Sequence, residues 1–291
     1  MTENPDSAFY LYGFTRSDFV PKGPSVQPLP PASVSATGSG TLVPEAVGID
    51  EGHPPFFWCA GDTAAVLSRV SRDEFCGPAA DSKLQDLAWV GPRACRHEAV
   101  LAQTLAFAPV LPARFGTLFS SLEVLGQFME RHRETITQFL EQVTDQEEWA
   151  VKGLLDRTRA EEGLLHRKSA EAKEPPASSP GLAYLQEQRA RLKVRQELEG
   201  WLAGACRALL EELTPLASEA CEREVLSRPP TGGDQERVLN WAFLVPRRAV
   251  GEFQTRVERG TASQTLPGLT FALSGPWPPY SFCPALPAGP A

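Results

Sequence analysis

Residues 109–119 read PVLPARFGTLF, which predicts a buried strand, a tight turn and then a long helix. Arg114 is the only charge in this apolar run. Burying an unpaired guanidinium costs on the order of several kcal/mol, so Arg114 needs a partner. It either pairs with a carboxylate at the sheet edge or serves as a functional anchor, and the sequence leaves both readings open. Gly116 supplies the free φ that a turn from strand to helix requires.

The chain before this run contains strands rich in aromatic and apolar residues, followed by a helix. Near-continuous apolar character in the first strand indicates burial on both faces. Residues 21–55 are rich in Pro, Ser, Gly and Thr and are interpreted as a surface loop or linker with a short strand near 41–43. The predicted elements are strands at 8–14, 56–60 and 64–70 and a helix that begins at Gly91-Pro92 and ends before Pro109.

After residues 109–119, apolar side chains recur at three- and four-residue steps from 120 to 143, which predicts a helix with Ser120 or Ser121 as its N-cap. A strand at 148–155 follows. The order of strands and helices predicts an α+β fold, with a ferredoxin-like domain at 1–156 and its helices on one face of the sheet.

The remaining residues, 157–291, predict a second α+β domain with long helices. Charged residues at 157–173 favour a helix, and prolines at 175, 176 and 180 break the chain. The next helix is expected from 182 to about 225, kinked at Pro215, with a charge-dense first part typical of a solvated or coiled-coil arm. A strand at 238–245, a helix from Pro246 to Gly260 and a strand at 269–274 complete the domain.

Composition excludes several classes of function. The chain has 291 residues, a net charge of −8 and 42% hydrophobic residues, with a sequence pI near 5.2. An acidic protein of this kind repels phosphate backbones, so nucleic acid is not an expected partner. No basic and apolar leader is recognised at the N-terminus, and the longest apolar stretch is too interrupted to span a bilayer. Six cysteines without paired spacing are expected to be reduced thiols in a cytoplasmic protein.

No motif of catalysis or cofactor binding is found. The chain has no phosphate-binding loop, no dinucleotide fingerprint and no nucleophile elbow. Cys95 and His97 have the spacing of two metal ligands, but no second pair accompanies them, and a Cys and a His on a helix surface is the simpler interpretation. We therefore expect no catalytic residue, no metal and no cofactor.

The C-terminal segment SGPWPPYSF, residues 274–282, is the most distinctive run. Its prolines stiffen the backbone, and its aromatic side chains offer large surfaces at a small entropic cost. It either fastens one domain to another or docks a partner protein. The candidate interface residues are therefore Arg114, Phe115 and Gly116 together with Trp277, Pro278, Pro279, Tyr280 and Phe282.

The chain resembles the gas vesicle protein GvpL/GvpF family. The resemblance rests on the runs at 10–14, 97–101, 110–117, 148–152 and 275–282, which keep the family's order over nearly the whole chain. The last two runs are the most specific. The loop at 21–55 looks longer than the family's usual connection and is given no role.

The resemblance implies a two-domain, non-enzymatic accessory protein of gas vesicle formation, located in the cytoplasm and in the vesicle. Its implied partners are the hydrophobic major shell protein, bound during nucleation so that its aggregation is limited, and other accessory proteins. The alternative is a ferredoxin-like enzyme or ligand sensor with a pocket between the domains, which would need a closed polar pocket with perturbed titratable groups.

Overall fold

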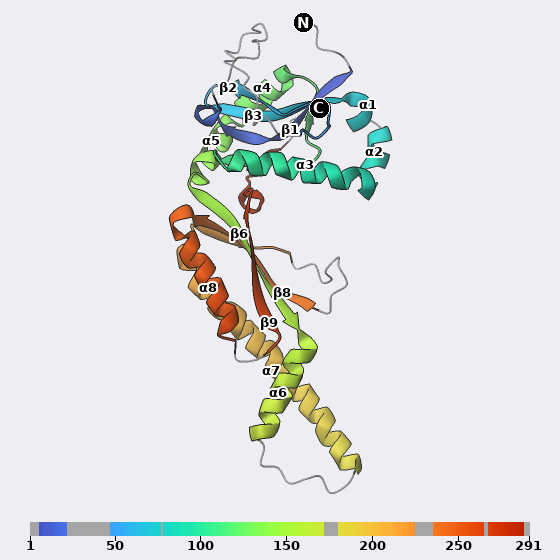
Figure 1. The fold of residues 1–291 in the computed structure, drawn as a ribbon, viewed down its shortest axis with the longest axis vertical. Coiled ribbons are helices and arrows are strands. Elements are labelled where there is room, and N and C mark those ends of the chain that lie inside the picture. Colours follow the sequence, from blue (N-terminus) through green and yellow to red (C-terminus); the bar gives the residue numbers. More distant parts are fainter. Residues whose placement is uncertain are drawn as a thin grey trace. The chain divides into compact units, whose positions relative to one another are not determined.

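The computed structural model describes residues 6–21, 47–76, 78–171, 180–224, 235–264 and 267–287 (Figure 1). Helices and antiparallel sheets are combined, so the predicted α+β class is confirmed. The described residues up to Gln146 and from Trp277 onward form a first compact unit, and Glu147–Pro276 forms a second. The second unit is thus inserted in the chain of the first. The short strand expected near 41–43 lies outside the described residues.

This division differs in two places from the expected domains 1–156 and 157–291. Strand β6 (Gln146–Asp156) pairs in the sheet of the second unit and does not close the first. The C-terminal segment belongs to the first unit and not to the second. The sequence order alone could not assign either segment, because strand pairing is decided by contacts between residues far apart in the chain.

The sheet of the first unit has the strand order β2-β3-β1-β4, with β5 also paired to β1. The three long strands were all predicted. The strands are β1 (Ser7–Arg16), β2 (Phe56–Ala60), β3 (Thr63–Ser71), β4 (Val110–Pro112) and β5 (Leu118–Phe119), and the helices are α1 (Arg72–Phe75), α2 (Pro78–Leu84), α3 (Leu87–Leu105), α4 (Leu122–Arg131) and α5 (Arg133–Gln142).

Strand β1 lies inside this sheet and pairs antiparallel with both β3 and β4. Its register with β3 shifts between Leu11 and Gly13, so Tyr12 is an extra residue in a bulge. Gly13 permits a close approach to β4, because a Cβ there would lie 2.6 Å from the Leu111 carbonyl oxygen. The bulge therefore depends on a residue without a side chain.

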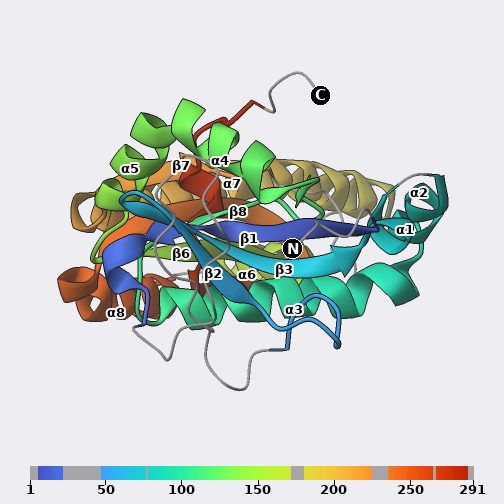
Figure 2. The same ribbon diagram turned by 90° about the horizontal axis from the view of Figure 1, so that it is seen from above.

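Helices cover both faces of this sheet, as the two views show (Figures 1 and 2). Tyr10 and Tyr12 contact His97 of α3, whereas Phe14, beyond the bulge, stacks on Phe128 of α4. The expectation of helices on one face only was wrong for this unit. The reason is the two-sided apolar character of β1, whose residues from Ala8 to Thr15 are all buried.

Two helix boundaries differ from the prediction. Helix α3 begins at Leu87, after Asp86 whose side chain accepts a hydrogen bond from the Ala88 amide, and Pro92 lies inside it near its first turn. The helix expected at 120–143 is divided at His132 into α4 and α5. Ser121 caps α4 as predicted, because its hydroxyl accepts from the Val124 amide at 3.2 Å.

The sheet of the second unit has the strand order β7-β8-β6-β9. Its element order, a strand, helices, two strands, a helix and a strand, is that of a split β-α-β arrangement. Besides β6, it contains α6 (Arg157–Glu171), α7 (Pro180–Leu213), β7 (Glu219–Glu222), β8 (Gln235–Pro246), α8 (Val250–Ala262) and β9 (Leu269–Trp277).

The core of the second unit lies between this sheet and its helices. Helices α6 and α7 meet through Ala160, Leu164, Val194 and Leu198, and Phe253 of α8 packs in the same cluster. The helix expected at 182–225 ends at Leu213, so Pro215 lies in a short 3-10 turn and does not kink a helix. The following strand β7 was not predicted. A coiled-coil character for the first part of α7 stays a prediction.

Candidate interaction site around His97

The two halves of the predicted interface come together inside the first unit. Phe115, in the turn after β4, and Tyr280, in the C-terminal segment, both pack against the same buried cluster. His97 of α3 lies at its centre. Its side chain is only 1% exposed, and Phe115 and Tyr12 place their rings 5.9 and 5.6 Å from it. The site is therefore built from β1, α3, the 113–116 turn and the C-terminal segment.

A line of hydrogen bonds runs through His97. The Gly116 amide donates to the Tyr10 hydroxyl at 3.2 Å, and the same hydroxyl lies 2.8 Å from His97 Nδ1. On the other side of the ring, Nε2 lies 3.1 Å from the Tyr280 hydroxyl. That hydroxyl donates to Glu98 Oε1 at 2.7 Å. The line thus connects the turn at Gly116 with the C-terminal segment.

The direction of these bonds defines the protonation of the ring. Tyr280 uses its single hydrogen on Glu98, so it accepts from His97 and Nε2 carries the N–H. Nδ1 is then the acceptor for Tyr10, whose oxygen in turn accepts from Gly116. Tyr10, His97 and Tyr280 each donate one bond and accept one bond along the line. A neutral imidazole with its hydrogen on Nε2 satisfies the line completely.

Burial keeps this imidazole neutral. Desolvation lowers the pKa of His97 from 6.5 to about 4, and a hydrogen bond with the Ala113 backbone opposes that shift only in part. Burial likewise raises the pKa of Tyr10 and of Tyr280. At neutral pH the imidazole and the two tyrosine hydroxyls of the line are therefore uncharged.

The turn at 113–116 has the geometry that its sequence predicts. Gly116 has a φ of 85°, where only glycine is unstrained. Arg114 is exposed, so the expectation of a buried charge in need of a partner was wrong. The strand β4 ends at Pro112, two residues before it. The Arg114 carbonyl accepts from the Thr117 amide at 3.2 Å and the Thr117 hydroxyl at 2.7 Å, which closes the turn.

The C-terminal segment lies against the first unit through its proline and tyrosine residues. Pro278 and Pro279 are buried and Phe282 is half-buried, whereas Trp277 is 45% exposed. The segment closes in a short turn, in which the Tyr280 amide donates to the Pro278 carbonyl at 2.7 Å. Cys283 follows it and points its thiol at the Pro279 carbonyl at 3.3 Å. The prolines and Tyr280 therefore contribute the buried part of the contact, and Trp277 is partly exposed.

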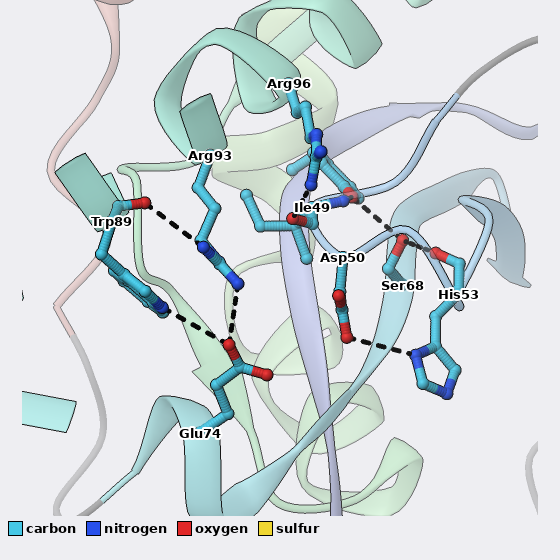
Figure 3. A network of polar contacts seen from close by, with 9 residues as sticks. Ile49, Asp50, His53, Ser68, Glu74, Trp89, Arg93 and Arg96 are labelled. Atoms are coloured by element: carbon cyan, nitrogen blue, oxygen red, sulfur yellow. Dashed lines mark hydrogen bonds and ion pairs between the residues drawn. The ribbon is translucent and has the colours of Figure 1, made fainter. Parts of the chain in front are cut away.

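A second polar network lies beside the first on α3 (Figure 3). The Tyr12 hydroxyl accepts from the Ile49 amide at 2.6 Å and lies 2.9 Å from the Ser68 hydroxyl. Ser68 donates onward to the His53 carbonyl at 3.1 Å. Arg96 of α3 donates to the Ile49 carbonyl at 3.4 Å. These contacts hold residues 49–53 against the sheet.

The same figure shows how the first turns of α3 are held. Arg93 donates to Glu74 of α1 at 2.7 Å and to the Trp89 carbonyl at 3.3 Å. Its guanidinium also lies 4.2 Å from the centre of the Trp89 ring, a cation–π geometry. The arginine thus joins α1 to α3 by an ion pair, while its stacking on Trp89 is a contact within α3.

Sequence reasoning missed Tyr10, His97 and Glu98 as members of this site. His97 was placed on the helix surface with Cys95, but only Cys95 is exposed. The signal was present, because His97 precedes Leu101 by four residues and Thr104 by seven, and all three are buried on one face.

Metal binding, membrane insertion and a closed reaction pocket find no support in the described ranges. They contain no cluster of three His, Cys, Asp or Glu side chains that could hold a metal ion. No helix among them is both long and apolar enough to cross a bilayer. A hollow of about 380 Å³ lies between α7 and α8, and Glu212 is the one charged residue among those that line it.

Together, these features define an α+β protein of two sheet-and-helix units whose most developed site is a buried contact between segments of its own chain. The chain belongs to the family of gas vesicle synthesis proteins GvpL/GvpF, whose model matches residues 8–284.

Curated relatives carry gas vesicle names. The chain is 29% identical to gas vesicle protein L of Streptomyces sp. (strain CB03234) over 253 residues, which cover 86% of this chain and 90% of the relative. It is 28% identical to gas vesicle protein F of Dolichospermum flosaquae over 204 residues, covering 68% and 79%.

Solved structures share the fold. The crystal structure of GvpF from Anabaena sp. PCC7120 matches with a TM-score of 0.61 at 19% identity, over 96% of this chain and 97% of the other. The crystal structure of GvpF from Microcystis aeruginosa matches with a TM-score of 0.59 at 16% identity, over 96% and 99%. The structures show the shared fold, and the family match with the curated relatives shows a role connected with gas vesicles.

Proposed function

We propose that this protein is an assembly factor and minor component of gas vesicles, which binds the hydrophobic major shell protein during nucleation and limits its aggregation. The observation that carries the proposal is the family match over residues 8–284. Relatives named as gas vesicle proteins L and F support it over most of the chain. The proposed role is to present protein surfaces and involves no catalysis. Other gas vesicle accessory proteins are proposed as further partners.

The physical properties of the chain suit this role. A net charge of −8 favours solubility of the protein through mutual repulsion. A shell protein that is very hydrophobic needs a partner that covers its apolar surface before growth begins. The first unit offers large apolar side chains at its surface, with Leu87 at the start of α3 the most exposed of them. Such side chains contribute favourable binding free energy when an apolar partner buries them.

The proposal is tested with the full-length chain and the major shell protein of the same gas vesicle cluster. Tagged protein should retain the shell protein in a pull-down, and substoichiometric amounts should delay the rise of light scattering after the shell protein is diluted from denaturant. An acidic protein of similar size and no relation serves as the control. The proposal would be contradicted if the tagged protein does not retain the shell protein and light scattering rises as early with this protein as with the control protein.

Deletion of the gene provides the test in cells. Cells that lack this protein and any paralogue should fail to form refractile, buoyant vesicles, and expression of the full chain should restore them. Normal buoyancy in those cells would show that assembly does not need this protein.

A further inference from the structure

One polar side chain of the C-terminal segment, Tyr280, contacts the buried groups of the first unit directly. Tyr280 gives its hydrogen to Glu98 and receives one from His97, while Pro278 and Pro279 supply the apolar contact. Trp277, at the start of the segment, is 45% exposed. The segment thus lies on the unit as a strap, and the Tyr280 hydroxyl is its polar fastening to the line through His97.

This fastening works with only one protonation state of His97. The neutral ring accepts from Tyr10 through Nδ1 and donates to Tyr280 through Nε2. A second proton on Nδ1 would face the Tyr10 hydroxyl, whose oxygen already accepts from Gly116. The Tyr10 hydrogen would then lose its acceptor, and a charge would be buried among aromatic rings.

We propose that residues 277–287 are a releasable strap, and that protonation of His97 unfastens it by breaking the line from Tyr10 to Tyr280. Once Tyr280 leaves, Nε2 of His97 faces water and the charged ring is solvated. Protons therefore bind more readily to the released form than to the fastened one, and acid shifts the population towards release. The inference concerns a contact within the chain and does not depend on the proposed binding of shell protein.

The titratable and charged groups around His97 do not cancel the preference of protons for the released form. Strand β1 presents Tyr10 and Tyr12, both with a pKa that burial raises. From α3 come the carboxylate of Glu98 and the guanidinium of Arg96, which have opposite charges. The C-terminal segment presents Tyr280 and the thiol of Cys283, and Arg114 of the turn is exposed to solvent. Burial lowers the pKa of His97 to about 4 in the presence of all of them.

The size of the effect follows from the two pKa values. His97 has an ordinary pKa of 6.5 when solvated and one of about 4 in the fastened form. The ratio of released to fastened strap should therefore rise by up to about tenfold for each pH unit between roughly 6.5 and 4. Outside this interval the ratio should not depend on His97.

Hydrogen–deuterium exchange of the full-length protein tests the proposal. Exchange of the 277–287 peptide, corrected for the intrinsic effect of pH, should accelerate by about fivefold from pH 6.5 to 5.5, because half of the solvated rings already carry the proton at pH 6.5. Peptides from β1 and from α8 should stay protected over the same interval. Equal acceleration in β1 would indicate unfolding of the whole unit and would overturn the proposal, as would exchange of 277–287 that does not change with pH.

Two variants separate the strap from a general effect of acid. His97→Gln removes the titrating ring, and the corrected exchange of 277–287 should then no longer depend on pH. Tyr280→Phe keeps the His97 imidazole but removes the hydroxyl that fastens the strap. Exchange of 277–287 should then be fast already at pH 7, while β1 stays protected. Glu98→Gln keeps a neutral acceptor for Tyr280 and removes the nearest carboxylate, and the pH dependence should persist. If it disappears in Glu98→Gln and persists in His97→Gln, the titrating group is not His97 and the proposal fails.

Discussion

The hydroxyl of Tyr280 lies 3.1 Å from Nε2 of His97, although the two residues are 183 positions apart in the chain. The contact joins the C-terminal segment to a helix of the first unit, and the whole second unit lies between them in sequence. It turns two separate sequence signals, the aromatic strand at 8–14 and the proline-rich run at 274–282, into parts of one buried site.

Replacing Tyr280 by phenylalanine should lower the free energy of unfolding of the first unit by roughly 1–3 kcal/mol, because a hydrogen bond to a carboxylate is lost. Urea unfolding at pH 7, followed by a probe in the first unit, measures the change. Tyr184→Phe is the matched control. Tyr184 lies on α7, is 62% exposed, and should leave that free energy unchanged. An equal effect of both substitutions would contradict the structure.

The stability of the first unit should depend on pH through His97. Its pKa in the folded protein, about 4, lies below the ordinary 6.5, so the unfolded chain binds more protons between these values. Stability is then complete above about pH 6.5, falls as the pH drops towards 4, and loses about 3 kcal/mol in total. Urea titrations at several pH values measure this slope.

The slope should disappear in His97→Gln and remain in His53→Gln. His53 has a side chain that is 48% exposed, so it is a control histidine outside the buried line. If His97→Gln keeps the full slope, another group is responsible for the loss of stability in acid.

Gly13→Ala should destabilise the first unit by roughly 1–3 kcal/mol, as expected for overpacking. The new Cβ would lie 2.6 Å from the Leu111 carbonyl oxygen, and the backbone of β4 would have to move. Gly91→Ala is the control, since it lies in α3 and a Cβ there meets nothing within 4 Å. It should stabilise the unit by roughly 0.5–1 kcal/mol through helix propensity. Thermal unfolding of both variants provides the comparison.

Thr261→Val should weaken the second unit at the edge of its sheet. The Thr261 hydroxyl of α8 accepts from the Phe271 amide at 2.9 Å and lies 3.3 Å from its carbonyl, so it covers part of edge strand β9. Its loss should cost roughly 1–3 kcal/mol and favour self-association through the exposed edge.

Unfolding and light scattering at increasing protein concentration measure these two effects. Thr255→Val serves as the control, because that hydroxyl bonds only to the Gly251 carbonyl of its own helix, at 2.9 Å. A variant at Thr261 that is as stable and as monomeric as Thr255→Val would rule out a protective role for this side chain.

Much of the fold could be predicted because its strands have strong local signals. Runs such as 8–14 and 64–70 combine aromatic or β-branched residues with near-continuous apolar character, and both are strands in the structure. Strand β7, Glu219–Glu222, was missed because it is short, has a Glu at each end and follows a helical pattern. Its pairing with β8 supplies the order that its own sequence lacks.

The candidate site could be predicted only in its parts. Phe115, Gly116 and Tyr280 were recognised from their unusual sequence context, and the structure brings them together around His97. Whether this site is used in binding a partner stays a prediction. His97 links these residues because it is buried. The sequence does not show this burial clearly, because His97 is followed by a charged residue, Glu98. The burial expected for Arg114 was wrong, because the strand that was expected to bury it ends at Pro112, and its part in an interface stays a prediction.

The insertion of one unit into the other has a consequence for synthesis on the ribosome. A nascent chain that has emerged as far as Gln146 holds every strand of the first sheet but lacks Tyr280, the fastening that follows Pro276. The second unit, Glu147–Pro276, is complete before those last residues are translated. Although translation begins with the first unit, that unit acquires its final contact only after its neighbour has been made in full.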